Sequence, residues 1–277
     1  MKEQVIVVLK RSTWDQLLHS TNGFKGVALP AVCRARKVHL RHVKSVNQVL
    51  EALEKFGLKV VVVRGPEKDF KVTSSTKLVI TVGGDGTLLA ASHKVPAGIP
   101  ILGVNSDPRT STGYLCAAHA TDIEGFLKVK SFMGMTKKVT RLQVLVEGKV
   151  VSNRVLNEAL FSHVCPAAMT KFVLGKVRYG CSGLWVGTGA GSTGAMKSAG
   201  GTDYPPEHKS LQAIIREPYN GSGESMRCFL NGTSFRLISK VSDGILYLDG
   251  PFIQHPVKYE QRVDFKISTE PLSMILE

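Results

Sequence analysis

Residues 77–88 read KLVITVGGDGTL, and this stretch decides the fold class of the N-terminal half. Its first six residues are mostly apolar and β-branched, which is typical of a buried strand. Glycines follow at once, and a helix is predicted from Thr87. Glycines let backbone N–H groups approach a ligand without a Cβ in the way, and a helix start adds unpaired N–H groups and a positive dipole end. The stretch therefore predicts a phosphate-binding loop.

An aspartate is unexpected inside a phosphate-binding loop, because a carboxylate repels a phosphate. Asp85 is explained if it takes the proton of an attacking hydroxyl or helps to hold Mg²⁺. A plain Asp-Gly turn between strand and helix is the structural alternative. The loop is not a Walker A loop, since no Gly-Lys-Ser/Thr follows, and it lacks the G-x-G-x-x-G pattern of dinucleotide-binding folds.

Further strands and helices surround this loop in the first half of the chain. Apolar strand-like runs occupy residues 5–9, 58–63 and 100–104. A helix is predicted to begin at Ser45, where Ser45 and Gln48 fit a capping box, and to end before Gly57. No secondary structure is predicted for residues 20–44. Continuous apolar strands separated by helices predict a parallel sheet covered on both faces, in an α/β domain of residues 1–135.

The pattern changes to short strands after about residue 135. A hairpin is predicted over residues 141–151 around Glu147-Gly148, and another over 234–249 around Asp243-Gly244. We therefore expect a second, mainly β domain at residues 136–277. Its last stretch, about 256–277, could stay there or return to the first domain.

The charge predicts anionic ligands. Lys and Arg total 36 against 22 Asp and Glu, a net charge of +14 that attracts polyanions such as nucleic acid, anionic membrane or phosphorylated small molecules. No apolar run is long enough to span a bilayer, so no membrane partner is expected. The densest basic patch lacks interleaved aromatic residues, which argues against a nucleic-acid partner. This patch consists of Arg34, Arg36, Lys37, Arg41 and Lys44.

The cysteines favour reduced thiols and a cytoplasmic location. There are five of them, an odd number, and no C-x-x-C pair, which argues against a disulfide framework and a zinc site. No resident metal site is predicted from the sequence. The cysteines are Cys33, Cys116, Cys165, Cys181 and Cys228.

Two further motifs lie in the second half. Residues 187–201 read GTGAGSTGAMKSAGG, where small residues and hydroxyls allow a flat ring to pack against backbone; a Gly-rich linker is the alternative. Asn157-Glu158 offers an amide and a carboxylate side by side, which can bind the two hydroxyls of a ribose. Without other motifs, a surface pair would be the better interpretation.

Together these motifs resemble the NAD kinase family in order and rough spacing, over about residues 77–201. The resemblance rests on Gly83-Gly84-Asp85-Gly86-Thr87, on Asn157-Glu158, and on Gly191-Ser192-Thr193 through Ser198-Ala199-Gly200-Gly201. Finer features are similar to the plant-type NADH kinases. These are the stretches 103–108 and 111–118, Cys165-Pro166-Ala167-Ala168, Ser182-Gly183-Leu184 and Arg216-Glu217-Pro218.

The resemblance implies a Rossmann-like α/β domain followed by a β-sandwich domain. It implies an ATP-dependent kinase that phosphorylates the adenosine 2′-hydroxyl of NADH or NAD to give NADPH or NADP, with Mg²⁺ as cofactor. Such enzymes are homo-oligomers, dimers or larger, whose small-molecule partners are nucleotides.

Roles for individual residues also follow from the resemblance. It implies that Asp85 is the catalytic base, with Gly86 against the substrate, and that Asn157 and Glu158 hold the adenosine ribose. The residues implied to line the adenine pocket are Thr193, Gly194, Ala195 and Ser198. The residues implied to handle phosphate are Gly83, Gly84 and Thr87. Candidate cations for the phosphates are Lys197, Arg109, Arg178 and Arg216.

Two departures keep alternatives open. The main NAD kinase branch usually has Tyr where Ala195 stands and Asp where Ser182 stands, which changes one wall of the dinucleotide site. A catalytically weak dinucleotide sensor is therefore one alternative. A lipid kinase of the diacylglycerol or sphingosine type is another, because it shares the first glycine motif; the run Gly191–Gly201 argues against it.

Overall fold

The computed structural model describes residues 3–128, 132–219 and 229–276. It divides the chain into two compact units: unit 1 is Met1–Lys137 with Leu272–Glu277, and unit 2 is Lys138–Pro271. Cys33, Cys116, Cys165 and Cys181 are free thiols, and Cys228 lies outside the described residues. No helix in the described ranges is both long and apolar enough to cross a membrane.

Unit 1 is built on a sheet with the strand order β2-β1-β3-β4-β19-β6, in which β5 also pairs with β4. The pairs β1–β2, β1–β3, β3–β4 and β4–β19 are parallel. The strands predicted at 5–9, 58–63, 77–82 and 100–104 are confirmed within one or two residues. The strands are β1 (Gln4–Leu9), β2 (Lys59–Arg64), β3 (Thr76–Gly83), β4 (Pro100–Asn105), β5 (Ala118–His119), β6 (Thr136–Val139) and β19 (Leu272–Ile275).

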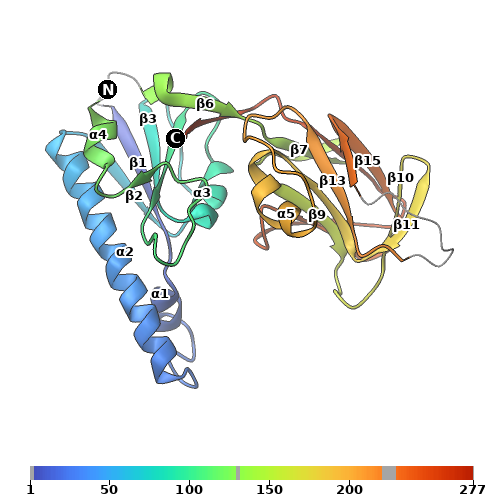
Figure 1. The fold of residues 1–277 in the computed structure, drawn as a ribbon, viewed down its shortest axis with the longest axis horizontal. Helices are drawn as coiled ribbons and strands as arrows, with labels where there is room; N and C mark the ends of the chain where they lie inside the picture. Colours follow the sequence, from blue (N-terminus) through green and yellow to red (C-terminus); the bar gives the residue numbers. More distant parts are fainter. Residues whose placement is uncertain (1–2, 129–131, 220–228, 277) are drawn as a thin grey trace. The chain divides into compact units, whose positions relative to one another are not determined.

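Helices cover both faces of this sheet (Figure 1). Val5, Val7 and Leu9 of β1 share a buried cluster with Val49 and Leu53 of the long helix α2. The alternate residues of β1 point to the opposite face, which α3 covers, because side chains along a strand alternate between faces. The helices are α1 (Thr13–Leu18), α2 (Leu29–Lys55), α3 (Asp85–Ser92) and α4 (Ile123–Leu127), with the 3₁₀ turn η1 (Phe132–Met135).

The predicted start of the helix at Ser45 is wrong, because α2 begins sixteen residues earlier, at Leu29. A proline lies in its first turn, where the missing N–H costs no hydrogen bond. The basic residues that obscured the helical period, such as Arg34 and Lys37, occupy exposed positions of α2. Ser45 lies within α2, so it does not cap the start of this helix; its hydroxyl donates to the carbonyl of Ser106 at 3.1 Å.

Unit 2 is a sandwich of two six-stranded sheets, ordered β11-β10-β15-β18-β7-β8 and β14-β13-β12-β9-β16-β17. Both sheets contribute to one core, where Phe161 of β9 meets Phe172 of β10 edge to face with ring centroids 6.0 Å apart. A parallel α/β unit and a mainly β unit confirm the predicted fold class. The first sheet has β7 (Leu142–Val146), β8 (Lys149–Val155), β10 (Thr170–Leu174), β11 (Val177–Cys181), β15 (Ser234–Ser239) and β18 (Arg262–Ile267). The second has β9 (Glu158–His163), β12 (Gly183–Gly187), β13 (Leu211–Arg216), β14 (Phe229–Gly232), β16 (Gly244–Leu248) and β17 (Ile253–Val257).

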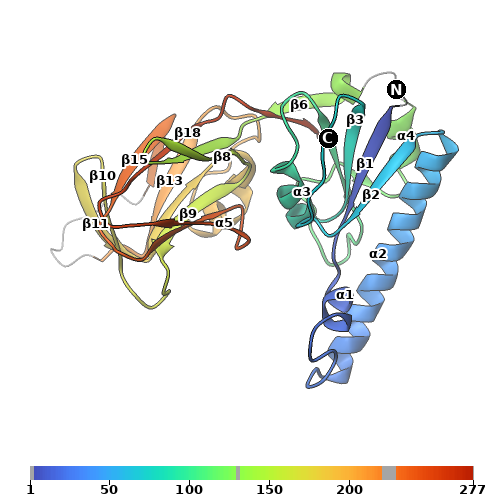
Figure 2. The ribbon, with the colours of Figure 1, turned by 180° about the vertical axis from the view of Figure 1, so that it is seen from behind.

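One of the two predicted hairpins is confirmed and the other is wrong. β7 and β8 pair across Glu147 and Gly148, whose φ angles of 49° and 75° are those of a tight hairpin turn. The segment around Asp243-Gly244 instead carries the chain between sheets: β15 pairs with β10 and β18 (Figure 2), whereas β16 pairs with β9 and β17. A turn signal marks where a strand ends but not which sheet receives the next strand.

The sandwich core predicts a large effect of truncating Phe161. Phe161 is fully buried, so Phe161→Ala should lower the free energy of unfolding by about 3–5 kcal/mol, measured by urea denaturation. Phe252 is 87% exposed, and Phe252→Ala should change it by less than about 0.5 kcal/mol. Equal losses in the two variants would contradict this placement of the core.

Candidate functional site

The glycine loop of unit 1 lies at a reversal of the strand order. From β1 the chain passes through α2 to β2 on one side, whereas β3 flanks β1 on the other. In open α/β sheets, ligands bind outside the carboxyl ends of the strands at such a switch point. Lys10 follows β1 there, Gly83 ends β3, and Gly84 is the N-cap of α3.

Two glycines of this loop pack tightly and the third faces open space. A Cβ built on Gly83 would lie 2.2 Å from the Thr87 hydroxyl oxygen and 3.0 Å from the Lys10 Cβ. A Cβ on Gly84 would lie 2.6 Å from the Ser111 hydroxyl oxygen. A Cβ on Gly86 meets nothing within 4 Å. Gly83 and Gly84 therefore let the loop close, while Gly86 leaves the start of α3 accessible.

Asp85 anchors a neighbouring loop, a role that the sequence analysis missed. It is the first residue of α3, and its two carboxylate oxygens accept hydrogen bonds from the backbone N–H groups of Leu115 at 2.8 Å and Tyr114 at 3.0 Å. An ionised carboxylate has about four acceptor positions, so part of its capacity remains open. Burial and then the charge of Asp85 raise the pKa of the nearby Cys116 thiol to about 12, so the thiol stays protonated.

An ion pair orders the segment after β4. Asp107 is 1% exposed and accepts two hydrogen bonds from Arg41 of α2, at 2.8 and 2.9 Å, and one from Thr110 at 2.6 Å. Burial opposes ionisation of Asp107, but the hydrogen bonds from Arg41 and Thr110 outweigh it and lower its pKa. Asn105 adds a bond to the carbonyl of Ser111 at 3.0 Å. Arg41, which belongs to the dense basic patch of the sequence, therefore serves a structural ion pair, whereas Arg109 is exposed.

In unit 2, the backbone around Asn157 and Glu158 is held by Asp249, which follows β16. The Asp249 carboxylate accepts the N–H groups of Leu156 and Asn157, both at 2.7 Å, and of Glu158 at 3.1 Å. Asp249 was not predicted from the sequence as a functional residue, because its only local signal is the Asp-Gly pair after a strand.

The glycine-rich segment packs directly on this turn. A Cβ on Gly191 would lie 2.4 Å from the Asn157 carbonyl oxygen, and the Thr188 hydroxyl donates to the Leu156 carbonyl at 2.5 Å. Asn157 and Glu158 are thereby brought together with the 3₁₀ turn η2 (Ala190–Thr193) and the short helix α5 (Ala195–Ser198). Of the predicted adenine-pocket residues, Thr193 and Ala195 are half-buried, and Gly194 and Ser198 are exposed.

Two buried polar atoms at this turn lack a partner within the described chain: Asn157 Oδ1 and Glu158 Oε2. Burial, with a further contribution from the negative charge of Asp249, raises the pKa of Glu158 to about 8. At neutral pH the Glu158 side chain is therefore mostly a carboxylic acid that can donate a hydrogen bond, beside an amide oxygen that accepts one. A pair of ligand hydroxyls would satisfy both groups.

The plant-type motifs of unit 2 meet at a separate cavity of about 430 Å³. Cys165, Ser182 and Arg216, each from a different motif, all line it. The Arg216 guanidinium lies 5.6 Å from the centre of the Trp185 ring, a cation–π distance. Arg216 is thus placed at a cavity, and Lys197 instead forms an exposed ion pair with Asp203 at 2.6 Å.

A three-ligand metal centre is not found in residues 3–128, 132–219 and 229–276: no group of three or more His, Cys, Asp or Glu side chains is arranged to hold an ion. A Mg²⁺ that arrives with nucleotide phosphates needs only one or two protein carboxylates. Asp85 is the carboxylate of the glycine loop, so the residues present fit that mode of binding.

An α/β unit with a glycine loop at its switch point is an architecture typical of proteins that bind nucleotide phosphates. Comparison with known proteins identifies the family. The profile of the ATP-NAD kinase N-terminal domain matches residues 68–128. Over 229 residues the chain is 34% identical to a probable NADH kinase of Oryza sativa subsp. japonica, covering 72% of this chain and 70% of that protein. It is 35% identical to the NADH kinase of Arabidopsis thaliana, covering 72% of each chain.

Solved structures share the fold. An NAD kinase from Archaeoglobus fulgidus in complex with ATP matches with a TM-score of 0.66 at 21% identity, over 98% of this chain and 93% of that one. Yeast NADH kinase complexed with NADH matches with a TM-score of 0.67 at 15% identity, over 100% and 84%. The chain belongs to the NAD kinase family, which confirms the resemblance found in its motifs.

The contrast between two loop glycines predicts opposite effects on stability. Gly83→Ala should lower the free energy of unfolding by about 1–3 kcal/mol, because its Cβ would overlap the Thr87 side chain. Gly86→Ala should leave it unchanged or raise it by up to about 1 kcal/mol, because alanine favours a helix and the position is open. Urea denaturation of both variants measures this, and a destabilised Gly86→Ala with an unaffected Gly83→Ala would contradict it.

The raised pKa of Glu158 predicts a pH-dependent stability. Between about pH 4.5 and pH 8 the unfolded chain has lost the Glu158 proton while the folded chain retains it, so this group makes stability fall as pH rises. Glu158→Gln should therefore become more stable relative to the unmodified chain from pH 5 to pH 8, measured as the urea midpoint. The exposed Glu207→Gln is the control and should show no such trend. If the difference in urea midpoint between Glu158→Gln and the unmodified chain stayed constant with pH, it would contradict the burial of this carboxyl.

Proposed function

We propose that this chain is an ATP-dependent kinase that phosphorylates the adenosine 2′-hydroxyl of NADH or NAD, giving NADPH or NADP. The observation that carries the proposal is the buried pair of unpartnered atoms, Asn157 Oδ1 and Glu158 Oε2, in a chain of the NAD kinase family. A ribose diol offers hydroxyls that satisfy such a pair. Diacylglycerol offers a single hydroxyl rather than an adjacent pair, and this favours the dinucleotide.

The mechanism proposed for unit 1 is mostly one of positioning, because phosphoryl transfer is catalysed mainly by alignment and charge neutralisation. The N–H groups at the start of α3 and the loop of Gly83, Gly84 and Thr87 would hold phosphate oxygens. Mg²⁺ bound with the nucleotide would supply further charge neutralisation. Asp85, held in place by its two backbone hydrogen bonds, would accept the proton of the ribose hydroxyl, with Gly86 leaving room for the substrate.

The proposal for unit 2 is that it recognises the adenosine. Asn157 and Glu158 would bind the ribose, and Thr193, Gly194, Ala195 and Ser198 would line the adenine pocket. The packing of Gly191 against Asn157 supports a continuous surface for a nucleoside. The free thiols support a cytoplasmic location, and a homo-oligomeric state is part of the same proposal.

Initial rates with ATP and Mg²⁺ test the function directly. NADH and NAD are supplied separately as acceptors, and diacylglycerol serves as a lipid acceptor. Formation of NADPH or NADP supports the proposal. Tight NADH binding with no NADPH in a single-turnover assay would instead identify a sensor, and phosphorylated lipid would identify a lipid kinase.

The role of Asp85 predicts that Asp85→Asn lowers kcat by about 10²–10⁴-fold, because the proton acceptor is lost. The Kd for NADH, measured by fluorescence titration, should change by less than about threefold, since the loop keeps one carbonyl acceptor. Asp122→Asn is a matched control, because the Asp122 carboxylate also accepts a backbone N–H, from His119 at 2.9 Å, at an exposed position. A kcat within tenfold of the unmodified enzyme would remove Asp85 from the mechanism.

A further inference from the structure

The long helix α2 is bound to the segment after β4, residues 106–115. The Arg41 guanidinium donates two hydrogen bonds to the Asp107 carboxylate, from Nε at 2.8 Å and from Nη2 at 2.9 Å. One turn further along α2, the Ser45 hydroxyl donates to the carbonyl of Ser106 at 3.1 Å. Residues four apart are neighbours on one face of a helix, so α2 holds the start of the segment at two adjacent points.

The ion pair has the geometry that fixes side chains most firmly. Two parallel N–H···O bonds from one guanidinium define both the separation and the orientation of the two groups. The Asp107 side chain is 1% exposed and the Arg41 side chain 34% exposed, so one half of the pair is shielded from water. The Thr110 hydroxyl donates to the same carboxylate at 2.6 Å, which extends the network along the segment.

The segment after β4 leads from Asp107 to the glycine loop. The N–H groups of Thr110 and Ser111 both donate to the Asp107 carbonyl at 3.1 Å, and the Asn105 side chain donates to the Ser111 carbonyl at 3.0 Å. Ser111 packs on the loop itself, because a Cβ on Gly84 would lie 2.6 Å from the Ser111 hydroxyl oxygen. A shift of Asp107 would therefore be passed on to the glycine loop.

The same segment supplies the two N–H groups that hold Asp85. Leu115 and Tyr114 donate to the two carboxylate oxygens at 2.8 and 3.0 Å. Hydrogen bonds to an ionised carboxylate are short and directional, so the carboxylate follows these N–H groups when they move. A continuous set of hydrogen bonds and contacts thus leads from Arg41 to the group that is proposed to accept the proton.

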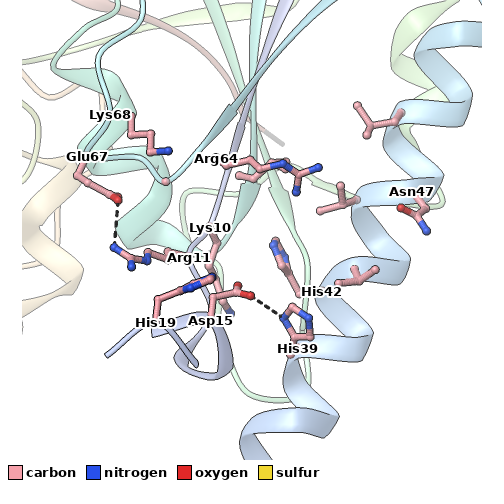
Figure 3. Close-up of a pocket in the computed structure, with 15 residues that line it drawn as sticks. Lys10, Arg11, Asp15, His19, His39, His42, Asn47, Arg64, Glu67 and Lys68 are labelled. Atoms are coloured by element: carbon pink, nitrogen blue, oxygen red, sulfur yellow. Dashed lines mark ion pairs between the residues drawn. The ribbon is translucent and has the colours of Figure 1, made fainter. Parts of the chain in front are cut away.

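Helix α2 is itself a firm support for this set. Its fully buried Val49 belongs to the same hydrophobic cluster as the side chains of β1. Near Arg41 the helix borders a cavity of unit 1, where His39 lies beside Asp15 (Figure 3). Nδ1 of His39 lies 3.5 Å from the Asp15 carboxylate and 2.9 Å from the Ser12 hydroxyl. The helix is therefore fixed on both sides of Arg41, as a positioning group requires.

We propose that Arg41 and Asp107 are positioning residues for phosphoryl transfer: through the segment after β4, their ion pair holds the Asp85 carboxylate where it meets the acceptor hydroxyl. The inference rests on the proposed function, because it takes Asp85 as the proton acceptor. The ion pair touches no substrate in this scheme, so its loss lowers the rate of transfer and leaves dinucleotide binding intact. A misplacement of about 1 Å at a reacting group can cost about 10²-fold in rate.

The test compares two double variants of the full chain that keep the net charge. Arg41→Gln with Asp107→Asn, the neutral-pair variant, leaves no buried charge without a partner, so it is expected to fold. Lys55→Gln with Glu124→Gln, the control variant, removes an exposed ion pair of 3.0 Å between the same helix and α4. With ATP and Mg²⁺, the neutral-pair variant should show a kcat about 10–100-fold lower and a KM for NADH within about threefold of the unmodified enzyme. The control variant should stay within about twofold in both constants.

A double-mutant cycle with Asp85→Asn separates positioning from a general loss of structure. If the ion pair acts through Asp85, the neutral-pair change should lower kcat by less than about twofold in the Asp85→Asn chain, because the group that it positions is already absent. Equal losses of kcat with and without Asp85 overturn the proposal.

Hydrogen exchange provides a readout that does not depend on activity. The N–H groups of Tyr114 and Leu115 should exchange at least about tenfold faster in the neutral-pair variant than in the control variant, because their hold on Asp85 is loosened. Unchanged exchange at both positions overturns the proposal. A chain that makes no NADPH but shows the faster exchange contradicts the proposed function, while it supports the link from Arg41 to Asp85.

Discussion

Half-buried carboxylates that accept backbone N–H groups hold both candidate clusters in shape. Asp85 receives the N–H groups of residues 114 and 115 in unit 1, and Asp249 receives those of residues 156–158 in unit 2. Hydrogen bonds to an ionised acceptor are roughly twice as strong as neutral ones. Asp249 keeps this arrangement despite a φ of 50°, which is unfavourable for a residue other than glycine. The clusters thus depend on side chain–backbone bonds between segments that are distant in sequence.

That dependence explains how far the sequence could predict the structure. The strands and the hairpin at Glu147-Gly148 were predictable, because their signals are local: β-branched runs and a turn dipeptide. The roles of Arg41 and Asp249 were not, because the partner residues lie 66 and about 92 positions away. Asn157 and Gly191 were grouped only through family resemblance, since nothing local in the sequence says that Gly191 packs on Asn157.

The positive charge of the chain has more than one use. The densest basic cluster of the sequence lies on α2, and its residues have different surroundings. Arg41 pairs with the buried Asp107, whereas Arg34 and Lys37 face solvent. Other cations, such as Lys10 and Arg64, line a cavity and come from positions scattered along the sequence. A dense basic run therefore marks a helix face, whereas Lys10 and Arg64 lie at or directly after the ends of β1 and β2.

The space around the glycines differs from one position to the next, and this indicates which backbone is open to a ligand. Gly83 and Gly191 lie so close to other atoms of their own unit that any side chain would displace them, and a Cβ on Gly189 would lie 2.1 Å from the Pro205 carbonyl oxygen. These glycines serve internal packing. Gly86 has open space around its Cβ position, and the nearest atom to that of Gly194 is 3.6 Å away. Gly194 has φ −96° and ψ −124°, outside the regions that residues with a side chain favour, so its backbone conformation itself explains the glycine. At Gly86, neither a contact nor a positive φ requires a glycine, so the backbone there is open to a ligand.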